Sequence, residues 1–326
     1  MKDVFIVEAV RTAIGSFGGA FAATGAVDLG AAVVKALLER TKVGAAEVDE
    51  IVLGCVLQAG LGQNPARQVL VKAGLPVERT AMTVNMVCGS GLRAVAAAAQ
   101  AVKAEDAALV IAGGTENMTQ APYILKQARY GYRMGHGELV DSMIFEGLTD
   151  IFNGYHMGIT AENLAAKYGL SREAQDAFAA ASQNKTEKAI AAGRFKDEIV
   201  PVYLPQKKGD PIVVDKDEFP RPGVTAEALG KLRPAFKPDG TVTAGNASGI
   251  NDGAAAVMVA DQEEMERHGL EPLARIASYG WHGCDPSIMG IGPVEAVRLA
   301  LSRAGWTLAD VEDRKSTRLN SSHVAL

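Results

Sequence analysis

The sequence has few cysteines for its length. The 326 residues include only three, Cys55, Cys88 and Cys284, an odd number at wide spacing. Such a set fits neither a disulfide framework nor a cysteine-based metal site, so we expect no bound metal and a reducing, cytoplasmic location. Each cysteine is therefore treated as a free thiol.

Long apolar runs and a strong charge of either sign are also missing. The first apolar run, Val4–Val7, is too short for a signal peptide, and no stretch approaches the roughly 18 apolar residues of a membrane span. The net charge of −5 predicts no nucleic-acid or membrane partner. The absence of a GxGxxG fingerprint and of a P-loop argues against nucleotide-dependent redox chemistry and phosphoryl transfer.

Up to about residue 115 the sequence alternates between apolar runs and amphipathic segments. Strands are predicted at Val4–Val10, Glu50–Val56, Met82–Val87 and Ala107–Gly114. Helices are predicted at Asp28–Lys42 with Asp28 as N-cap, at Asn64–Gly74 with Asn64 as N-cap, and at Leu92–Lys103. This alternation predicts an α/β fold with a mostly parallel sheet covered on both faces, on which the alanine-rich third helix packs closely.

Residues 120–245 interrupt the pattern. A long helix, Ser171–Gly193, is followed by short strands between prolines. We interpret residues 120–245 as an inserted loop domain, after which the alternation resumes.

The chain also repeats part of itself. Aligned without gaps, residues 34–50 and 297–313 are identical at five of 17 positions, which predicts two similar halves. The first copy continues into a strand, whereas the second continues into RKSTRLNSSHVAL, which has no strand pattern. We therefore expect an incomplete second half and a tail, residues 314–326, that does not belong to the fold.

Cys88 lies in the segment NMVCGSGLRA, between a predicted strand and a predicted helix. Gly89 and Gly91 permit a sharp turn, and a helix start supplies N–H groups and partial positive charge that favour a thiolate. This arrangement is typical of a nucleophile on a turn, although a buried structural cysteine is an equal alternative from the residues alone. Cys55 is predicted to be a core residue, and Cys284, in a loop, stays open between the two roles.

Two further segments carry candidate site residues. In FNGYHMGITAENLAAKYG, His156 precedes a helix whose predicted N-cap is Thr160, and a structural hydrogen bond is favoured over a role as general base. In GNASGINDGAAA, small residues with Asn246, Ser248, Asn251 and Asp252 are predicted to form a turn that lines a pocket or caps a helix.

Together, the segments VNMVCGSGLRA, AGGTENMTQAPY, GYHMGITAENLA, GTVTAGNASGINDGAAA and GPVEAVRLALSRAGW resemble the thiolase family. The resemblance is strongest to its short-chain, biosynthetic acetyl-CoA acetyltransferases and runs from Met1 to about residue 313. It implies two related α-β-α layered halves. Residues 1–119 with 246–270 would form the N-terminal half, residues 120–245 an inserted domain for CoA binding and tetramerisation, and residues 271–313 the start of the C-terminal half.

The resemblance also implies an acyltransferase without a cofactor, because the CoA thioester is the substrate. Cys88 matches the nucleophile that accepts an acetyl group, and a second cysteine then deprotonates another acetyl-CoA. Claisen condensation gives acetoacetyl-CoA and CoA, reversibly. Contacts with the substrate are implied for His156, Met157, Arg221, Phe236, Ala244, Gly245, Ser248 and Met289. A homotetramer assembled partly through residues 120–135 is implied as well.

The sequence departs from the family in its last residues. The NEAF segment, the GHP segment with the activating base and the C-x-G-G-G segment with the second cysteine do not occur in the 326 residues, and His323 lacks a GHP context. The resemblance therefore implies little turnover by the chain as written. A longer-chain 3-ketoacyl-CoA thiolase, a non-catalytic CoA- or lipid-binding thiolase-like module and an unstable fragment are the alternatives.

Overall fold

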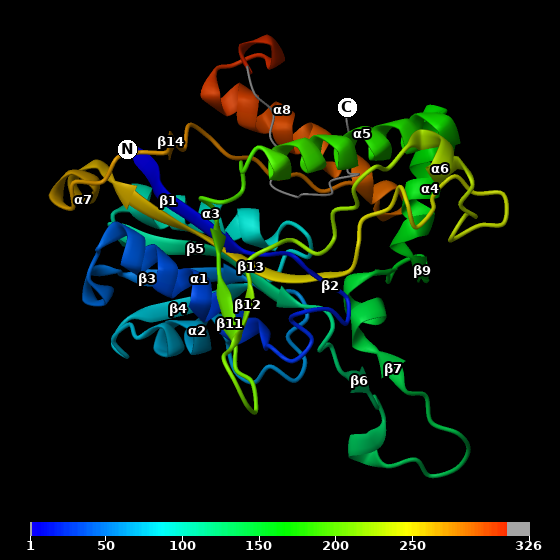
Figure 1. Cartoon of the computed structure of the whole chain (residues 1–326), viewed down its shortest axis with the longest axis horizontal. Coiled ribbons are helices and arrows are strands. Elements are labelled where there is room, and N and C mark those ends of the chain that lie inside the picture. Colours follow the sequence, from blue (N-terminus) through cyan, green and yellow to red (C-terminus); the bar gives the residue numbers. More distant parts are fainter. Residues whose placement is uncertain (1, 312–326) are drawn as a thin grey trace. The chain divides into compact units, whose positions relative to one another are not determined.

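The computed structural model describes residues 2–311, which divide into two compact units (Figure 1). Within the described residues, unit 1 comprises residues 2–147, 196–218 and 250–276, and unit 2 comprises residues 148–195, 219–249 and 277–311. The predicted tail, residues 314–326 with His323, lies outside the described residues. These two units are groups of residues in mutual contact and do not test the predicted division into an N-terminal half, an inserted domain and a C-terminal half, which stays a prediction.

Unit 1 is built on a mixed sheet. Its strands are β1 (Val4–Thr12), β2 (Gly15–Ser16), β3 (Glu50–Gly54), β4 (Thr80–Val84), β5 (Leu109–Asn117), β10 (Ile199–Val200), β13 (Asn251–Asp261) and β14 (Ala274–Arg275). Its helices are α1 (Ala26–Thr41), α2 (Pro65–Ala73), α3 (Ser90–Ala104) and α7 (Gln262–Arg267), with short turns η1 (Ala45–Glu47), η2 (Ala128–Tyr130) and η3 (Met143–Gly147). Two small hairpins, β6 (Tyr123–Ile124) with β7 (Val140–Asp141) and β11 (Val202–Leu204) with β12 (Ile212–Val214), complete the unit.

The strand order is β10-β1-β13-β5-β3-β4. β3 pairs in parallel with both β4 and β5, and β10 pairs in parallel with β1. β13 runs antiparallel to both β1 and β5, so the prediction of a mostly parallel sheet is wrong for this part of the sheet. The sequence gives little sign of this strand, because alanines fill much of it and no polar–apolar alternation marks a solvent face.

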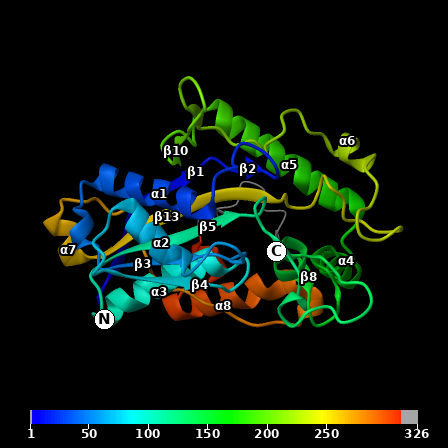
Figure 2. The same ribbon diagram turned by 90° about the horizontal axis from the view of Figure 1, so that it is seen from below.

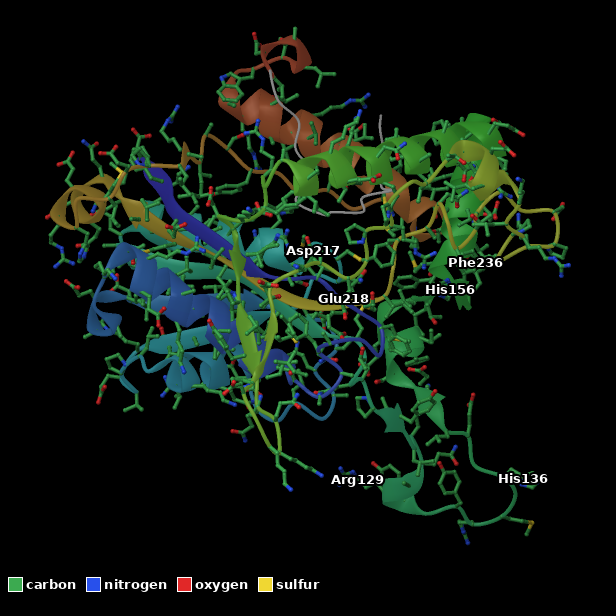
Figure 3. The ribbon with its side chains drawn as sticks, in the orientation of Figure 1. Arg129, His136, His156, Asp217, Glu218 and Phe236 are labelled. Carbon is green, nitrogen blue, oxygen red and sulfur yellow. The ribbon has the colours of Figure 1, made fainter. Side chains whose placement is uncertain are left out.

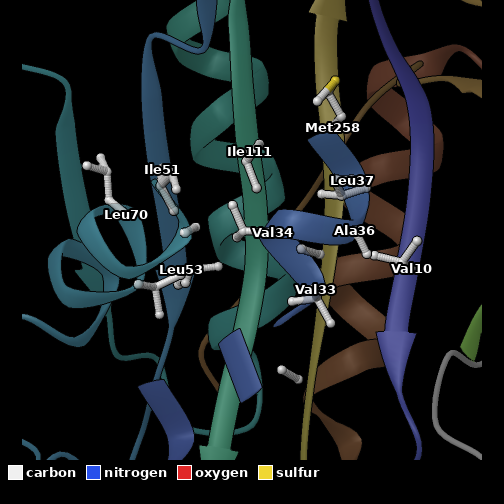
Figure 4. Close-up of a cluster of buried hydrophobic side chains, with 14 of the residues drawn as sticks. Val10, Val33, Val34, Ala36, Leu37, Ile51, Leu53, Leu70, Ile111 and Met258 are labelled. Carbon is white, nitrogen blue, oxygen red and sulfur yellow. The ribbon is translucent and has the colours of Figure 1, made fainter. Parts of the chain in front are cut away.

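The hydrophobic core of unit 1 lies between the sheet and helices α1 and α2 (Figure 4). Ile51 and Leu53 of β3 and Ile111 of β5 are at most 1% exposed and pack in one cluster with Val33 and Leu37 of α1. Burial of each such side chain contributes about 1.5–3 kcal/mol. This apolar contact fixes the strand ends that carry the candidate site.

Helix α3 covers the opposite face of the sheet (Figure 2). Its buried side chains are small, including Ala94, Ala98 and Ala99. A Cβ atom at Gly54, the last residue of β3, would lie 2.6–2.7 Å from the backbone of Ser90 and Gly91. The first turn of α3 therefore rests directly on the end of β3, which confirms the predicted close packing of this helix.

The predicted helix boundaries differ in their accuracy. Helix α2 has Asn64 as N-cap, its Oδ1 accepting a hydrogen bond from the Arg67 N–H at 3.2 Å, and it ends at Gly74, as predicted. Helix α1 begins at Ala26 after Gly25, so the prediction of Asp28 as N-cap is wrong. Asp28 instead lies in the first helical turn, where its charge favours the helix dipole, and it pairs with Lys72.

The segment that leaves unit 1 after β12 is anchored by acidic side chains (Figure 3). The Arg11 guanidinium donates to both oxygens of Asp217, at 2.7 and 3.0 Å. The Glu218 carboxylate accepts from the Ser16 N–H at 2.8 Å and from the Ala20 N–H at 3.1 Å. Both anchors lie a few residues before Arg221, a predicted substrate residue.

Unit 2 is mainly helical. It contains β8 (Thr149–Asp150), β9 (Tyr155–His156), α4 (Met157–Tyr168), α5 (Arg172–Ala191), α6 (Ala226–Gly230), η4 (Pro286–Ile291), α8 (Gly292–Ala304) and η5 (Leu308–Asp310). Ser171 caps α5, as its place at the start of the predicted helix suggests: its Oγ accepts from the Ala174 N–H at 3.2 Å. None of the helices within residues 2–311 is both long and apolar enough to cross a bilayer.

The sequence repeat has a structural counterpart. Helix α1 is followed by a left-handed residue, Lys42, and by η1, and helix α8 is followed at the same offsets by a left-handed Gly305 and by η5. In both copies a carboxylate caps the short turn: Glu47 accepts from the Gly44 N–H, and Asp310 from the Thr307 N–H. Residues 34–48 and 297–311 therefore share local structure as well as sequence.

Candidate active site

Cys88 lies on a tight turn that joins β4 to α3. β4 ends at Val84, three residues earlier than predicted, and α3 begins at Ser90. Cys88 is exposed, which excludes the alternative of a buried structural cysteine. The preceding residue, Val87, has φ of 47°, a conformation that is unusual for a β-branched residue.

Side chains hold this turn in place. Asn85 Oδ1 accepts a hydrogen bond from the Val87 N–H at 3.0 Å. Ser90 Oγ accepts from the Met86 N–H at 2.8 Å and donates to the Val87 carbonyl at 2.6 Å. These three bonds offset the unfavourable conformation at Val87, and they present Cys88 at the start of a helix, where the dipole favours an anion.

Cys55 follows the neighbouring strand and has different surroundings. It is 1% exposed, and its Sγ lies 3.9 Å from Glu116 Oε1. Burial, with the nearby Glu116 carboxylate, raises the pKa of the Cys55 thiol to about 12. Cys55 is therefore a core thiol, as predicted, and it is a poor nucleophile at neutral pH.

Cys284 lies in unit 2 and is exposed. Its Sγ lies 3.7 Å from the carbonyl oxygen of Met289, a predicted substrate residue in η4. It is therefore not a core residue. Among residues 2–311, no group of three or more His, Cys, Asp or Glu side chains is placed to hold a metal ion.

His156 is the N-cap of α4, so the prediction of Thr160 as N-cap is wrong. His156 Nδ1 accepts a hydrogen bond from the Gly158 N–H at 3.0 Å, and the helix begins at Met157. Thr160 lies inside the helix and donates to the Met157 carbonyl at 2.6 Å. The sequence missed this boundary because an imidazole nitrogen replaces the usual hydroxyl or carboxylate cap.

The His156 ring stacks on Phe236, with centroids 4.7 Å apart and an interplanar angle of 22° (Figure 3). Gly158 leaves room for this contact, because a Cβ atom there would lie 2.3 Å from the Phe236 ring. Burial lowers the pKa of His156, which keeps the ring neutral with its proton on Nε2. The structure thus brings two predicted substrate residues, His156 and Phe236, together.

The loop with Ala244, Gly245 and Ser248 is held by buried polar side chains. Glu162 of α4 is 4% exposed and accepts from the backbone N–H groups of residues 241 and 242 at 2.8–2.9 Å. Asn246 Nδ2 donates to Asp176 of α5 at 2.9 Å. Ala244 and Ser248 remain exposed on this loop.

Glu162 and Asp176 are positioning groups that the sequence analysis missed. Asp176 also pairs with Arg172 at 2.6 Å, so a buried carboxylate, a guanidinium and an amide satisfy one another. The only sequence signal for this network is an acidic residue at helical spacing from alanines, Glu162 before Ala165 and Asp176 before Ala179 and Ala180.

The remaining predicted residues also lie in unit 2. The backbone N–H of Arg221 donates to Gln183 Oε1 of α5 at 3.0 Å, and Arg221 is exposed. Met157 begins α4, and Met289 lies in η4, which is tied to α4 by the bond from Asn163 Nδ2 to the Ser287 carbonyl at 2.9 Å. All eight predicted substrate residues therefore belong to unit 2, whereas Cys88 belongs to unit 1.

The chain matches two family models, the thiolase N-terminal domain over residues 4–263 and the thiolase C-terminal domain over residues 270–315. It is 61% identical to an acetyl-CoA acetyltransferase of Pseudomonas aeruginosa, covering 96% of this chain and 79% of that protein. It is likewise 61% identical to an acetyl-CoA acetyltransferase of Chromobacterium violaceum, over 95% of this chain and 79% of the relative. The crystal structure of the Bacillus anthracis acetyl-CoA acetyltransferase is similar, with a TM-score of 0.93 at 43% identity over 96% of this chain and 79% of that one.

Proposed function

The chain belongs to the thiolase family, and we propose that it is an acetyl-CoA acetyltransferase whose nucleophile is Cys88. The predicted resemblance and the thiolase fold are confirmed by these matches. The names of the related proteins support the substrate, acetyl-CoA. The observation that carries the assignment of the nucleophile is the exposed position of Cys88 on a braced turn at the start of α3.

The proposed reaction has two steps. The Cys88 thiolate attacks the thioester carbonyl of acetyl-CoA, the bond from that carbonyl to the CoA sulfur breaks, and CoA leaves as a thiolate that takes up a proton. A base then removes a proton from the methyl carbon of a second acetyl-CoA. The resulting carbanion attacks the acetyl carbonyl on Cys88, which releases the Cys88 thiolate and acetoacetyl-CoA. The reverse direction is thiolysis, and neither direction requires a cofactor.

The residues of unit 2 are proposed to bind the substrate. The stacked pair of His156 and Phe236 offers a flat apolar wall with one polar edge, which suits a short acyl group and the pantetheine arm. Exposed Arg221 supplies a positive charge for the phosphates of CoA. Ala244, Gly245 and Ser248 offer small side chains on a loop fixed by Glu162, so an extended ligand has room to lie against it.

The GHP and C-x-G-G-G segments, which the family resemblance associates with the two general bases, do not occur in the 326 residues. General bases contribute typically about 10²–10⁴-fold each. We therefore assign neither general base to a residue of this sequence, and the proposal concerns the acetylation of Cys88.

Assembly and location are proposals as well. The hairpin of β6 and β7 carries Tyr130 and Met134, which are 86% and 96% exposed, and such side chains favour a contact between subunits. We propose a homotetramer that uses residues 120–135. A nucleophilic thiol also requires reducing surroundings, which favours the cytoplasm.

The proposal is tested by incubating the purified chain with acetyl-CoA and measuring its intact mass. The expected result is a mass increase of one acetyl group per chain. Hydroxylamine, which cleaves thioesters, is expected to remove this group. Parallel incubations with longer acyl-CoAs and with CoA alone separate the alternatives. Preferential labelling by long acyl groups indicates a longer-chain 3-ketoacyl-CoA thiolase. CoA binding without any adduct indicates a non-catalytic module and overturns the proposal.

A further inference from the structure

The turn before Cys88 is connected to the loop after β3. The Cys55 N–H donates to the Val84 carbonyl at 3.1 Å, which extends the contact between the two strands by one residue. Beyond Val84, the side chain of Asn85 makes the next contact between the two segments. Its Nδ2 donates to the Val56 carbonyl at 3.3 Å, while its Oδ1 accepts from the Val87 N–H at 3.0 Å. One side chain thus joins the β3 loop to the residue that precedes the nucleophile.

The other side of the same peptide is held by Glu116, at the end of β5. One carboxylate oxygen accepts from the Val56 N–H at 2.8 Å, and the other accepts from the Leu57 N–H at 3.0 Å. β3 lies between β4 and β5, so the loop that follows it is fixed from both neighbouring strands. Val56 is therefore held through its N–H by Glu116 and through its carbonyl by Asn85.

We propose that Asn85 and Glu116 are positioning residues for Cys88, with Glu116 acting through the Val56 peptide and Asn85. The proposal rests on the proposed role of Cys88 as nucleophile. Neither side chain bonds to Cys88 itself. Asn85 sets the backbone of Val87, whose φ of 47° is unusual for valine, and this backbone determines where the Cys88 side chain points. Glu116 fixes the loop against which Asn85 is oriented.

The chemistry of the two side chains fits this role. An ionised carboxylate only accepts hydrogen bonds, so Glu116 takes two N–H donors without competing for the Val56 carbonyl. An amide both donates and accepts, and Asn85 uses both functions, one toward each segment. Aspartate at position 85 would keep the acceptor toward Val87 but would lose the donor toward Val56.

The test measures the rate of Cys88 acetylation at saturating acetyl-CoA and the acetyl-CoA concentration that gives half this rate. Asn85→Ala is expected to slow acetylation on the order of 10²-fold, because misplacement of a reacting group by about 1 Å has effects of this size. The half-saturating concentration is expected to change less than about threefold, since the predicted substrate residues are untouched. Asn85→Asp, which keeps the bond to Val87, is expected to recover part of the rate.

Glu116→Gln is expected to slow acetylation by about tenfold, because its amide keeps only one acceptor for the two N–H groups. The double variant Asn85→Ala with Glu116→Gln is the sharpest test. Since both residues act through Val56, the double variant is expected to be no slower than Asn85→Ala alone. Multiplied effects would contradict the proposed connection.

Asn184→Ala and Glu39→Gln are matched controls, because both side chains are exposed, and both variants are expected to acetylate at the wild-type rate. Circular dichroism and thermal unfolding show whether each variant folds, and the more conservative Asn85→Asp and Glu116→Gln keep the test decisive where Asn85→Ala does not fold. Wild-type acetylation with an equally fast Asn85→Ala overturns this inference alone. Absence of the adduct in the wild-type chain overturns the proposed function instead.

Discussion

Cys55 and Cys88 follow neighbouring parallel strands of one sheet, yet the chain gives them opposite surroundings. Gly54 at the end of β3 pairs with Val84 at the end of β4, so the two strands end level with each other. Cys55 comes next in the chain and is enclosed, with its pKa raised to about 12 by burial and by Glu116. Cys88 comes after a turn of three residues and is exposed.

The difference arises from the path of the chain beyond each strand. After β3 the chain stays close to the sheet, and Glu116 binds its N–H groups, so Cys55 is covered. After β4 the turn reverses the chain into α3, and the positive φ at Val87 lifts Cys88 to the surface at the helix start. The backbone conformation after each strand, rather than the presence of a cysteine, therefore decides which thiol is exposed and able to react.

The largest expected effect concerns acetylation. Cys88→Ala is expected to lose the acetyl adduct, a fall of at least about 10³-fold, because the nucleophile is removed. Cys55→Ala and Cys284→Ala are expected to retain it. Intact-mass time courses with acetyl-CoA measure all three variants. An adduct that persists in Cys88→Ala but disappears in Cys55→Ala would show that Cys55, and not Cys88, accepts the acetyl group.

The next expected effect concerns alkylation by iodoacetamide at pH 8. A thiol with a pKa of about 12 is ionised about 10³-fold less than an ordinary thiol with a pKa of about 9. Peptide mapping is therefore expected to show Cys55 labelled about 10³-fold more slowly in the folded chain than in the urea-unfolded chain, and the exposed Cys88 labelled faster than Cys55. The rate at Cys55 should rise about tenfold per pH unit, because its thiolate fraction does so below its pKa. Equal labelling of both cysteines in the folded chain would show that the Cys55 thiol is neither enclosed nor shifted to a higher pKa.

Gly54 lies at the end of β3, directly before Cys55, and contacts the first turn of α3, which follows Cys88. Gly54→Ala would place a Cβ atom 2.6–2.7 Å from the first turn of α3, so the helix start must shift. We expect a loss of about 1–3 kcal/mol in the free energy of unfolding, together with slower acetylation of Cys88. Gly230→Ala is the control, because its Cβ atom would meet nothing within 4 Å. Urea unfolding compares the two, and an unchanged midpoint for Gly54→Ala would show that α3 does not rest on β3.

The smallest expected effect is on the free energy of unfolding. Here the substitution of Cys55 is expected to have a larger effect than the substitution of Cys88. Cys55→Ala is expected to lower the free energy of unfolding by about 1 kcal/mol, because it removes buried contacts. Cys88→Ala is expected to change it by less than about 0.5 kcal/mol, because the side chain is exposed. Thermal unfolding measures both. A larger loss at Cys88 than at Cys55 would indicate a structural role for Cys88.

The parts of the fold that sequence predicts well are those with local signals. Helix α2 carries Asn64, Pro65 and Gly74 at its ends, and all three act as predicted. Strand β13 could not be placed in the sheet from its own residues, because its antiparallel pairing with β1 and β5 depends on the path of the chain before it. The N-cap of α4 was missed because it is a histidine.

The candidate site also contains features with local sequence signals and features that depend on contacts between distant residues. The glycines around Cys88 indicate the turn, since their function is local. The bonds from Asn85 to Val56 and from Val56 to Glu116 join residues 29 and 60 positions apart, and no periodicity in the sequence indicates them. The stacking of His156 on Phe236 is likewise a contact between distant segments of the chain.

The most direct test of the account is the position of the acetyl group in a single digest of the wild-type chain. After incubation with acetyl-CoA and quenching in acid, peptides with Cys55, Cys88 and Cys284 are quantified together by mass spectrometry. A thioester on Cys88 is expected, with Cys55 unmodified and Cys284 at the level of a control incubated without acetyl-CoA. Acetyl groups on Cys55 or Cys284 with none on Cys88 would contradict it.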